Sequence, residues 1–146
     1  ERVPYTIASS DSKRGTITLV IQRVGKSSEK VCQLEVGDYV TDLVGPLGNA
    51  THIENFGTVL CAGGGVGIAP MLPIIEAMKK AGNRVITVIG GRSKDYIILE
   101  DEVSKYSDEV IIMTDDGSYG QKGLITLGVQ QVIEREKVNL CVTSIT

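Results

Sequence analysis

The chain has 146 residues, which is long enough for one ordinary domain or for one domain and part of a second. Hydrophobic residues make up 42% and charged residues 23%, a mixture typical of globular proteins and not of disordered ones. The formal net charge is −3 and no run of basic residues occurs, which argues against nucleic acid as the main partner. No apolar stretch approaches the roughly 20 residues of a membrane-spanning helix, so we expect no membrane span.

The three cysteines, Cys32, Cys61 and Cys141, are odd in number and widely spaced. This spacing matches neither a disulfide framework nor a zinc site, so we expect no bound metal in this chain. Each cysteine lies in an apolar run, which predicts a small buried side chain in all three cases. A reducing, cytoplasmic location fits this usage best.

Residues 1–48 carry the signals of β structure. Runs rich in Val, Ile, Thr and Tyr predict strands at 4–9, 15–24 and 38–44, with a turn signal at 25–28. Residues 16–22 alternate polar and apolar side chains, as a half-buried antiparallel strand does. Because only about three or four strands fit here, too few to close a barrel, we expect a partial β-barrel.

The remainder of the chain alternates between continuous apolar runs and helical patterns. The predicted strands are 58–62, 84–89, 109–114 and 140–142, and the predicted helices are 70–81, 99–106 and 124–137. Continuous apolar runs suit strands that are buried on both faces of a parallel sheet. The alternation therefore predicts an α/β fold, a doubly wound parallel sheet.

We divide the chain into a partial barrel over 1–56 and an α/β domain over 57–146. The sequence has no starting Met, and it ends in the strand-like run 140–146 without a closing turn or helix. We therefore expect an excised fragment whose second domain is truncated at its C-terminus.

A glycine-rich loop follows the first buried strand of the α/β part and precedes a helix. It reads Gly63-Gly64-Gly65-Val66-Gly67-Ile68-Ala69-Pro70. A helix N-terminus offers unpaired N–H groups and a favourable dipole to a pyrophosphate, provided that no side chain blocks the approach. Gly63, Gly64 and Gly65 allow a tight turn, and Gly67 lets the backbone come near the phosphates. Pro70 is expected to start the helix, where a missing N–H costs little.

The loop departs from the usual dinucleotide fingerprint in two ways. Pro70 replaces the third glycine, and no acidic residue ends the second strand, where a ribose 2′-hydroxyl is often held. That position reads Gly90-Gly91-Arg92-Ser93. Arg92 is compatible with three roles: contact with a 2′-phosphate, stacking on adenine, or simple solvation in a loop.

Six stretches, taken in chain order, resemble motifs of the ferredoxin–NADP reductase superfamily. They are Arg2-Val3-Pro4-Tyr5-Thr6-Ile7, Gly25-Lys26-Ser27-Ser28, Gly45-Pro46-Leu47-Gly48-Asn49, the glycine loop, Gly90-Gly91-Arg92-Ser93 and residues 114–123. The most similar branch comprises the electron-transfer or gamma subunits of dihydroorotate dehydrogenase, NAD(P)H–ferredoxin oxidoreductase and sulfhydrogenase (hydrogenase) complexes. The resemblance covers essentially the whole chain.

This resemblance implies FAD and NAD(P)H as cofactors. By the family pattern Arg2 meets the flavin phosphate, Tyr5 and Thr6 lie against the isoalloxazine ring, and Lys26 and Ser27 contact the flavin pyrophosphate. The glycine loop and the two later motifs bind the nicotinamide nucleotide. The expected cofactor-binding residues are Arg2, Tyr5, Thr6, Lys26, Ser27, Gly63, Gly64, Gly65, Gly67, Ala69, Pro70, Gly91, Arg92, Ser93, Asp115, Asp116 and Gly117.

The same pattern implies parts that the sequence does not contain. In the family, further barrel strands precede the arginine motif, and a nicotinamide-side element and the cysteines of a [2Fe–2S] cluster come later. The cluster is therefore expected only in the full-length protein, and the fragment alone is expected to be inactive. The implied partner is a catalytic or electron-accepting subunit, with ferredoxin, orotate, polysulfide and protons as candidate terminal acceptors.

Asp115 and Asp116 admit more than one interpretation. A carboxylate pair for acid–base chemistry is disfavoured, because adjacent loop residues rarely face one reacting atom and hydride transfer to a flavin needs no such pair. A capped turn is one alternative. We favour a loop that lines the nicotinamide pocket.

The resulting hypothesis is an electron-transfer oxidoreductase subunit that passes a hydride from NAD(P)H to FAD and electrons onward to an iron–sulfur centre. No catalytic side chain is expected, because the cofactors supply the chemistry. One rival is a non-catalytic, regulatory nucleotide-binding module. A second rival, a flavin-free Rossmann-type enzyme, is disfavoured by Arg2, Tyr5 and Thr6. Both NADH and NADPH remain candidate donors.

Overall fold

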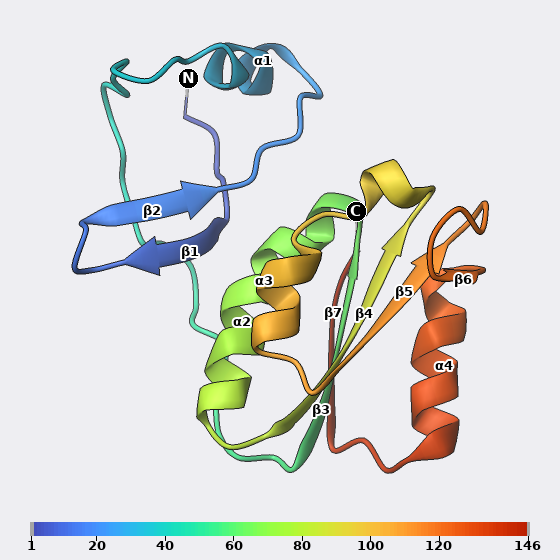
Figure 1. Cartoon of the computed structure of the whole chain (residues 1–146). Helices are drawn as coiled ribbons and strands as arrows, with labels where there is room; N and C mark the ends of the chain where they lie inside the picture. Colours follow the sequence, from blue (N-terminus) through green and yellow to red (C-terminus); the bar gives the residue numbers. More distant parts are fainter. Residues whose placement is uncertain (1, 146) are drawn as a thin grey trace.

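The structure, a computed structural model, describes residues 2–145. Its main element is a five-stranded parallel sheet in the order β6-β5-β4-β3-β7. The strands are β3 (Thr58–Gly64), β4 (Arg84–Gly91), β5 (Glu109–Thr114), β6 (Gln121–Lys122) and β7 (Leu140–Ile145). The predicted doubly wound α/β fold is therefore confirmed, as Figure 1 shows.

Helices cover both faces of this sheet (Figure 1). Against one face lie α2 (Ile68–Lys80) and α3 (Glu100–Lys105), and against the other lies α4 (Ile125–Arg135). Alternate residues of β3 serve the two layers: Val59 and Cys61 belong to the α2 side and Leu60 and Ala62 to the α4 side. All four are completely buried, which explains why this strand is a continuous apolar run.

The helix boundaries differ slightly from those expected. The helix predicted from residue 70 begins at Ile68, so Pro70 occupies its third position and not its first. The N–H groups of a helix's first turn have no partner within the helix, so a proline there costs no hydrogen bond. No pattern in the sequence predicted β6, which pairs with β5 through only two residue pairs. Of the helices within 2–145, none is long and apolar enough to cross a membrane.

The first part of the chain contains less β structure than predicted. A single antiparallel hairpin forms from β1 (Ile7–Asp11) and β2 (Thr16–Leu19), and it lies beside α2 (Figure 1). The expected alternation of burial in β2 is wrong, because Ile17 is 43% exposed. The strand predicted at 38–44 is also wrong. Those residues are exposed and pair with no strand within 2–145, and high β-propensity without a partner strand does not form a ladder.

The turn signal at 25–28 was likewise misinterpreted, because a helix, α1 (Lys26–Cys32), begins there. The Ser28 hydroxyl accepts hydrogen bonds from the backbone N–H groups of Val24 (2.9 Å) and Gly25 (3.0 Å). It also donates one to the carbonyl oxygen of Gly25 (2.9 Å). These bonds fix the chain reversal at the helix start, which is the role of a capping serine.

Asn83 joins the end of α2 to the segment that leads into β3. This side chain is buried, and its Oδ1 accepts hydrogen bonds from the N–H groups of Phe56 (2.7 Å) and Gly57 (3.1 Å). Its Nδ2 donates to the carbonyl oxygens of Glu54 (2.8 Å) and Met78 (2.9 Å). One amide group thus satisfies four backbone groups, which sets where β3 enters the sheet. The domain boundary predicted between residues 56 and 57 stays a prediction.

Replacing Asn83 by alanine should lower the free energy of unfolding by about 2–4 kcal/mol, because two backbone N–H groups lose a buried acceptor. Urea denaturation monitored by circular dichroism measures this change. The matched control is Asn139→Ala, since the exposed Asn139 accepts one bond, from the N–H of Thr58 (3.0 Å). That variant should lose about 0.5–1.5 kcal/mol. Equal losses in the two variants would contradict the role assigned to Asn83.

Candidate functional site

The glycine loop forms the sharp turn from β3 into α2. β3 ends at Gly64, a single 3₁₀ turn covers Gly65–Gly67, and α2 begins at the next residue. Gly65 has φ of +57°, a left-handed conformation that strains other residues. A Cβ on Gly63 would lie 2.8 Å from the Cα of Ile68, so only glycine permits this packing. The first turn of α2 consequently starts directly above the end of β3, where the sequence predicted an anion-binding turn.

This turn lies at the topological switch point of the sheet. From β3 the chain runs outward through β4 and β5, and it later returns to add β7 on the other side of β3. In open α/β sheets, ligands bind at the carboxyl ends of the strands next to such a point. The uncapped N-terminus of the 13-residue helix α2 faces this edge.

β4 ends at this same edge of the sheet with Gly91, and Arg92 and Ser93 follow it directly. Arg92 is exposed, and its guanidinium carbon lies 5.9 Å from the centre of the Tyr96 ring, a cation–π distance. Gly91 has no room for a side chain, because a Cβ would lie 3.0 Å from Cδ1 of Ile97. The three candidate roles of Arg92 all remain compatible with this exposed position.

The loop after β5 is a capped turn. Asp116 accepts a hydrogen bond from the N–H of Ser118 (2.9 Å), and bonding to Ser118 lowers the pKa of this carboxyl. The N–H of Asp115 donates to the carbonyl oxygen of Gly91 (3.1 Å), and that of Asp116 to the carbonyl oxygen of Arg92 (3.2 Å). The loop after β5 is therefore bonded to the Arg92 segment. That segment follows β4, the strand next to β3 and its glycine loop. That Asp115, Asp116 and Gly117 line a nicotinamide pocket stays a prediction.

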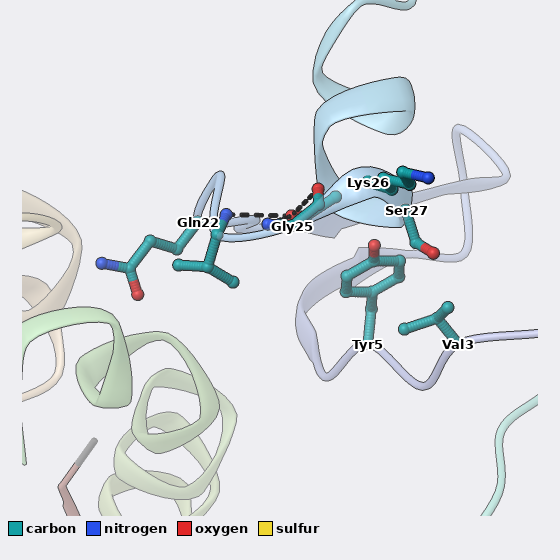
Figure 2. A pocket seen from close by; sticks show the side chains of 8 residues that line it. Val3, Tyr5, Gln22, Gly25, Lys26 and Ser27 are labelled. Atoms are coloured by element: carbon teal, nitrogen blue, oxygen red, sulfur yellow. Dashed lines mark hydrogen bonds between the residues drawn. The ribbon is translucent and has the colours of Figure 1, made fainter.

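A cavity of about 480 Å³ separates the N-terminal segment from the start of α1. It is lined by Val3, Tyr5, Gln22, Val24, Gly25, Lys26, Ser27 and Ser28. Figure 2 shows the Tyr5 hydroxyl pointing toward the first turn of α1, where Lys26 and Ser27 lie. This hydroxyl is buried and has no hydrogen-bond partner within residues 2–145. Tyr5, Lys26 and Ser27 are thus brought together, whereas Arg2 is exposed and lines neither this cavity nor the next.

A second cavity, of about 270 Å³, joins the N-terminal segment to the glycine loop. Its walls come from two parts of the chain. One wall consists of Pro4, Tyr5, Thr6, Val20, Ile21, Gln22 and Val24, and the other of Val66, Gly67, Ala69 and Pro70. Tyr5 lines both cavities, so the two candidate sites are continuous. Val66 and Gln22 were missed by the sequence analysis, since neither belongs to the fixed positions of a motif.

The cysteines follow the expected pattern only in part. Cys61 is buried in β3, and burial, with a smaller contribution from Cys141, raises its pKa to about 12. Cys32 and Cys141 are exposed, contrary to prediction, because one ends the surface helix α1 and the other lies on the edge strand β7. The described residues contain no group of three or more His, Cys, Asp or Glu side chains that could hold a metal ion.

A parallel sheet with a glycine turn at its switch point defines the class of α/β nucleotide-binding domains. Residues 61–142 match the family model of the oxidoreductase NAD-binding domain, and the chain belongs to this family. It is a member of the ferredoxin–NADP reductase-like superfamily, as the resemblance implied.

Two relatives and one solved structure are informative. The chain is 45% identical over 141 residues to the dihydroorotate dehydrogenase B (NAD(+)) electron transfer subunit homolog of Thermotoga maritima, covering 97% of this chain and 50% of that protein. It is 34% identical over 134 residues to the corresponding electron transfer subunit of Streptococcus mutans, covering 90% and 51%. A structure of the NADH-dependent reduced ferredoxin–NADP oxidoreductase, described for flavin-based electron bifurcation, matches with a TM-score of 0.91 and 41% identity, covering 99% and 52%. The chain thus spans about half the length of these proteins.

In the folded protein at pH 8, Cys61 should resist alkylation while Cys32 reacts. With a pKa of about 12, Cys61 is roughly one ten-thousandth thiolate at that pH, and it is sterically covered. Mass spectrometry after iodoacetamide treatment locates the label. Denaturant should expose Cys61 to reaction. Labelling of Cys61 at the rate of Cys32 without denaturant would contradict its position in the sheet.

Proposed function

We propose that this chain is the cofactor-binding part of an electron-transfer subunit in which NAD(P)H, bound at the glycine loop, reduces FAD bound beside Tyr5. The observation that supports it best is the shared cavity between Pro4, Tyr5 and Thr6 on one side and Gly67, Ala69 and Pro70 on the other. Hydride transfer requires donor and acceptor in contact, so the two cofactor sites of such a subunit must be continuous.

The pyrophosphate of the nicotinamide nucleotide is held by backbone N–H groups in this proposal, and not by charged side chains. The left-handed Gly65 and the helix start at Ile68 aim N–H groups and the positive end of α2 at the pyrophosphate. From this point one end of the dinucleotide reaches the cavity beside Tyr5. The other end, adenosine, would extend over the carboxyl end of β4, where Arg92 and Ser93 lie, toward the loop after β5. In this arrangement Asp115, Asp116 and Gly117 would lie at the adenosine end and not in the nicotinamide pocket favoured from the sequence.

The residues around the larger cavity fit a flavin. The buried Tyr5 hydroxyl has no partner within residues 2–145, and a flavin edge carries both donors and acceptors that would complete it. Lys26 contributes a cation to the same cavity, as the phosphates of FAD require, and Ser27 lies beside it. Tyr5 and Thr6 would lie against the ring system of FAD, and the exposed Arg2 would meet its phosphate. When bound, FAD accepts a hydride from NAD(P)H and releases its electrons one at a time.

The chain's own contribution to this reaction is positioning. Tyr5 lies at the boundary between the two cavities, and the side chains of Ala69 and Pro70 provide an apolar, uncharged wall opposite it. No general base is required, because a hydride carries its proton and electrons together. An iron–sulfur centre and a partner subunit outside this chain would accept the electrons. Proteins of similar sequence are electron transfer subunits of dihydroorotate dehydrogenase B, which supports a partner of the same kind.

The whole protein that carries this chain should be yellow, and NADH or NADPH should bleach it. Tyr5→Ala should weaken flavin binding by roughly 3- to 10-fold, because it removes an aromatic contact of about 0.5–1.5 kcal/mol. The matched control is Tyr39→Ala, since Tyr39 is 92% exposed. Absorption spectra and flavin release into the ultrafiltrate give the measurement. A folded, flavin-free protein that still binds nucleotide would replace this proposal with a regulatory nucleotide-binding module.

Arg92→Ala should weaken NADPH more than NADH, by about 1–3 kcal/mol if the guanidinium meets a 2′-phosphate through charge-assisted bonds. Binding of each nucleotide is followed by calorimetric titration. Lys13→Ala, in the exposed β1–β2 turn, is the charge-matched control and should change neither affinity. Equal losses for both nucleotides would mean that Arg92 stacks on adenine.

A further inference from the structure

The loop that follows β5 is built tightly although its side chains are exposed. Residues 115–118 all point to solvent, yet a Cβ on Gly120 would overlap the carbonyl oxygen of Ile112. The Thr114 hydroxyl donates to the carbonyl oxygen of Tyr119 (2.6 Å) and accepts from its N–H (3.3 Å). An exposed loop with no core residues of its own is thus held in one conformation.

Two cross-links connect this loop to the segment after β4. The N–H of Lys94 donates to the Ser118 hydroxyl (2.9 Å). The Tyr119 hydroxyl donates to the carboxylate of Glu100, at 2.8 and 3.0 Å from its two oxygens. Glu100 is the first residue of α3, and it follows Leu99, whose φ of +58° is the single left-handed value at a non-glycine within residues 2–145. Such a conformation is strained for a non-glycine residue and persists only where the surroundings fix it.

The aromatic ring of Tyr119 also contacts a cation at this edge of the sheet. The Lys94 ammonium nitrogen lies 5.4 Å from the centre of the Tyr119 ring, and the Arg92 guanidinium lies over the ring of Tyr96 in the same segment. Tyr119 therefore contacts a carboxylate through its hydroxyl and a cation through its face. Bonding to Glu100 also raises the pKa of the Tyr119 hydroxyl.

The tie between Tyr119 and Glu100 is not part of the hydrophobic core. Neither residue belongs to the two core clusters, and both are half-buried. A charge-assisted bond at the surface adds little to folding stability, so stability alone does not account for a strained residue placed beside it.

We infer that Tyr119 and Glu100 are positioning residues for the adenosine end of the dinucleotide. Their hydrogen bond holds Lys94 and the Arg92 segment in place at the carboxyl ends of β4 and β5. Figure 1 shows this loop and the N-terminal hairpin on opposite sides of the β3 end, so the two ends of a ligand lying across the glycine loop reach toward them. This inference rests on the proposed function, because it assumes that the glycine loop binds a dinucleotide.

The test uses the whole protein that carries this chain, with NADPH or NADH as donor and ferricyanide as electron acceptor. Tyr119→Phe keeps the ring over which Lys94 lies and removes only the hydroxyl, and Glu100→Ala removes its acceptor. Each should raise KM for the nucleotide about 3- to 10-fold, the equivalent of one net hydrogen bond, and leave kcat unchanged. Calorimetric titration of ADP-ribose should show the same loss of affinity.

Three further variants separate positioning from a general effect on structure. Glu100→Gln keeps an acceptor oxygen and should restore KM to within about twofold of the original protein. The double variant Tyr119→Phe/Glu100→Ala should be no worse than either single variant, because both remove one bond. Glu102→Ala, on the exposed side of α3, is the charge-matched control and should change nothing.

Unchanged KM in folded Tyr119→Phe and Glu100→Ala would overturn the inference, as would a loss in Glu102→Ala of the same size. A fall in melting temperature with no change in KM would assign the tie to stability alone. Failure of the original protein to bind any nucleotide is a different result, which would refute the proposed function itself.

Discussion

The close approach of α2 to the end of β3 is the constraint on which the site depends. A Cβ on Gly63 would lie 2.8 Å from both the Cα and the Cδ1 of Ile68, and Ile68 is completely buried. The helix start is therefore locked onto the strand end by core packing. Because Ala69 and Pro70 follow directly, the same contact fixes the wall of the smaller cavity. The glycine turn, although built from backbone, is therefore held by the packed core through Ile68.

The C-terminal end of α2 is fixed by one side chain, that of Asn83. Asn83 bonds the residues that enter β3 to the last turn of α2, so strand and helix are tied at both ends. α2 also carries the β1–β2 hairpin on its outer side, where Ala8 is 1% exposed. The helix α2 thus contacts both the hairpin that follows Tyr5 and the glycine loop, and it sets the distance between them. On the proposed function, one rigid element between the two cofactor sites would help to keep the cofactors in contact.

The sequence predicted the sheet well and the first 48 residues poorly, for one physical reason. β3, β4 and β5 are buried on both faces, so local composition alone identifies them, and β5 was predicted with its observed bounds. The run 38–44 has equal β-propensity but no partner strand within residues 2–145. The glycine loop could be recognised because its chemistry is local. The tie between Tyr119 and Glu100 could not, because it depends on a left-handed Leu99 and on residues 19 positions apart.

The two halves of the proposed site differ in how completely the chain builds them. At the glycine loop the constraints come from the chain itself: Gly65 has a left-handed φ, and Gly63 packs against the buried Ile68. At Tyr5 a buried hydroxyl has no partner, which costs about 1–3 kcal/mol as long as it stays unpaired. A ligand that offers this hydroxyl a donor or acceptor recovers that cost on binding. On the proposed function, a flavin beside Tyr5 would recover this cost, which favours a tightly held, resident group at that half of the site.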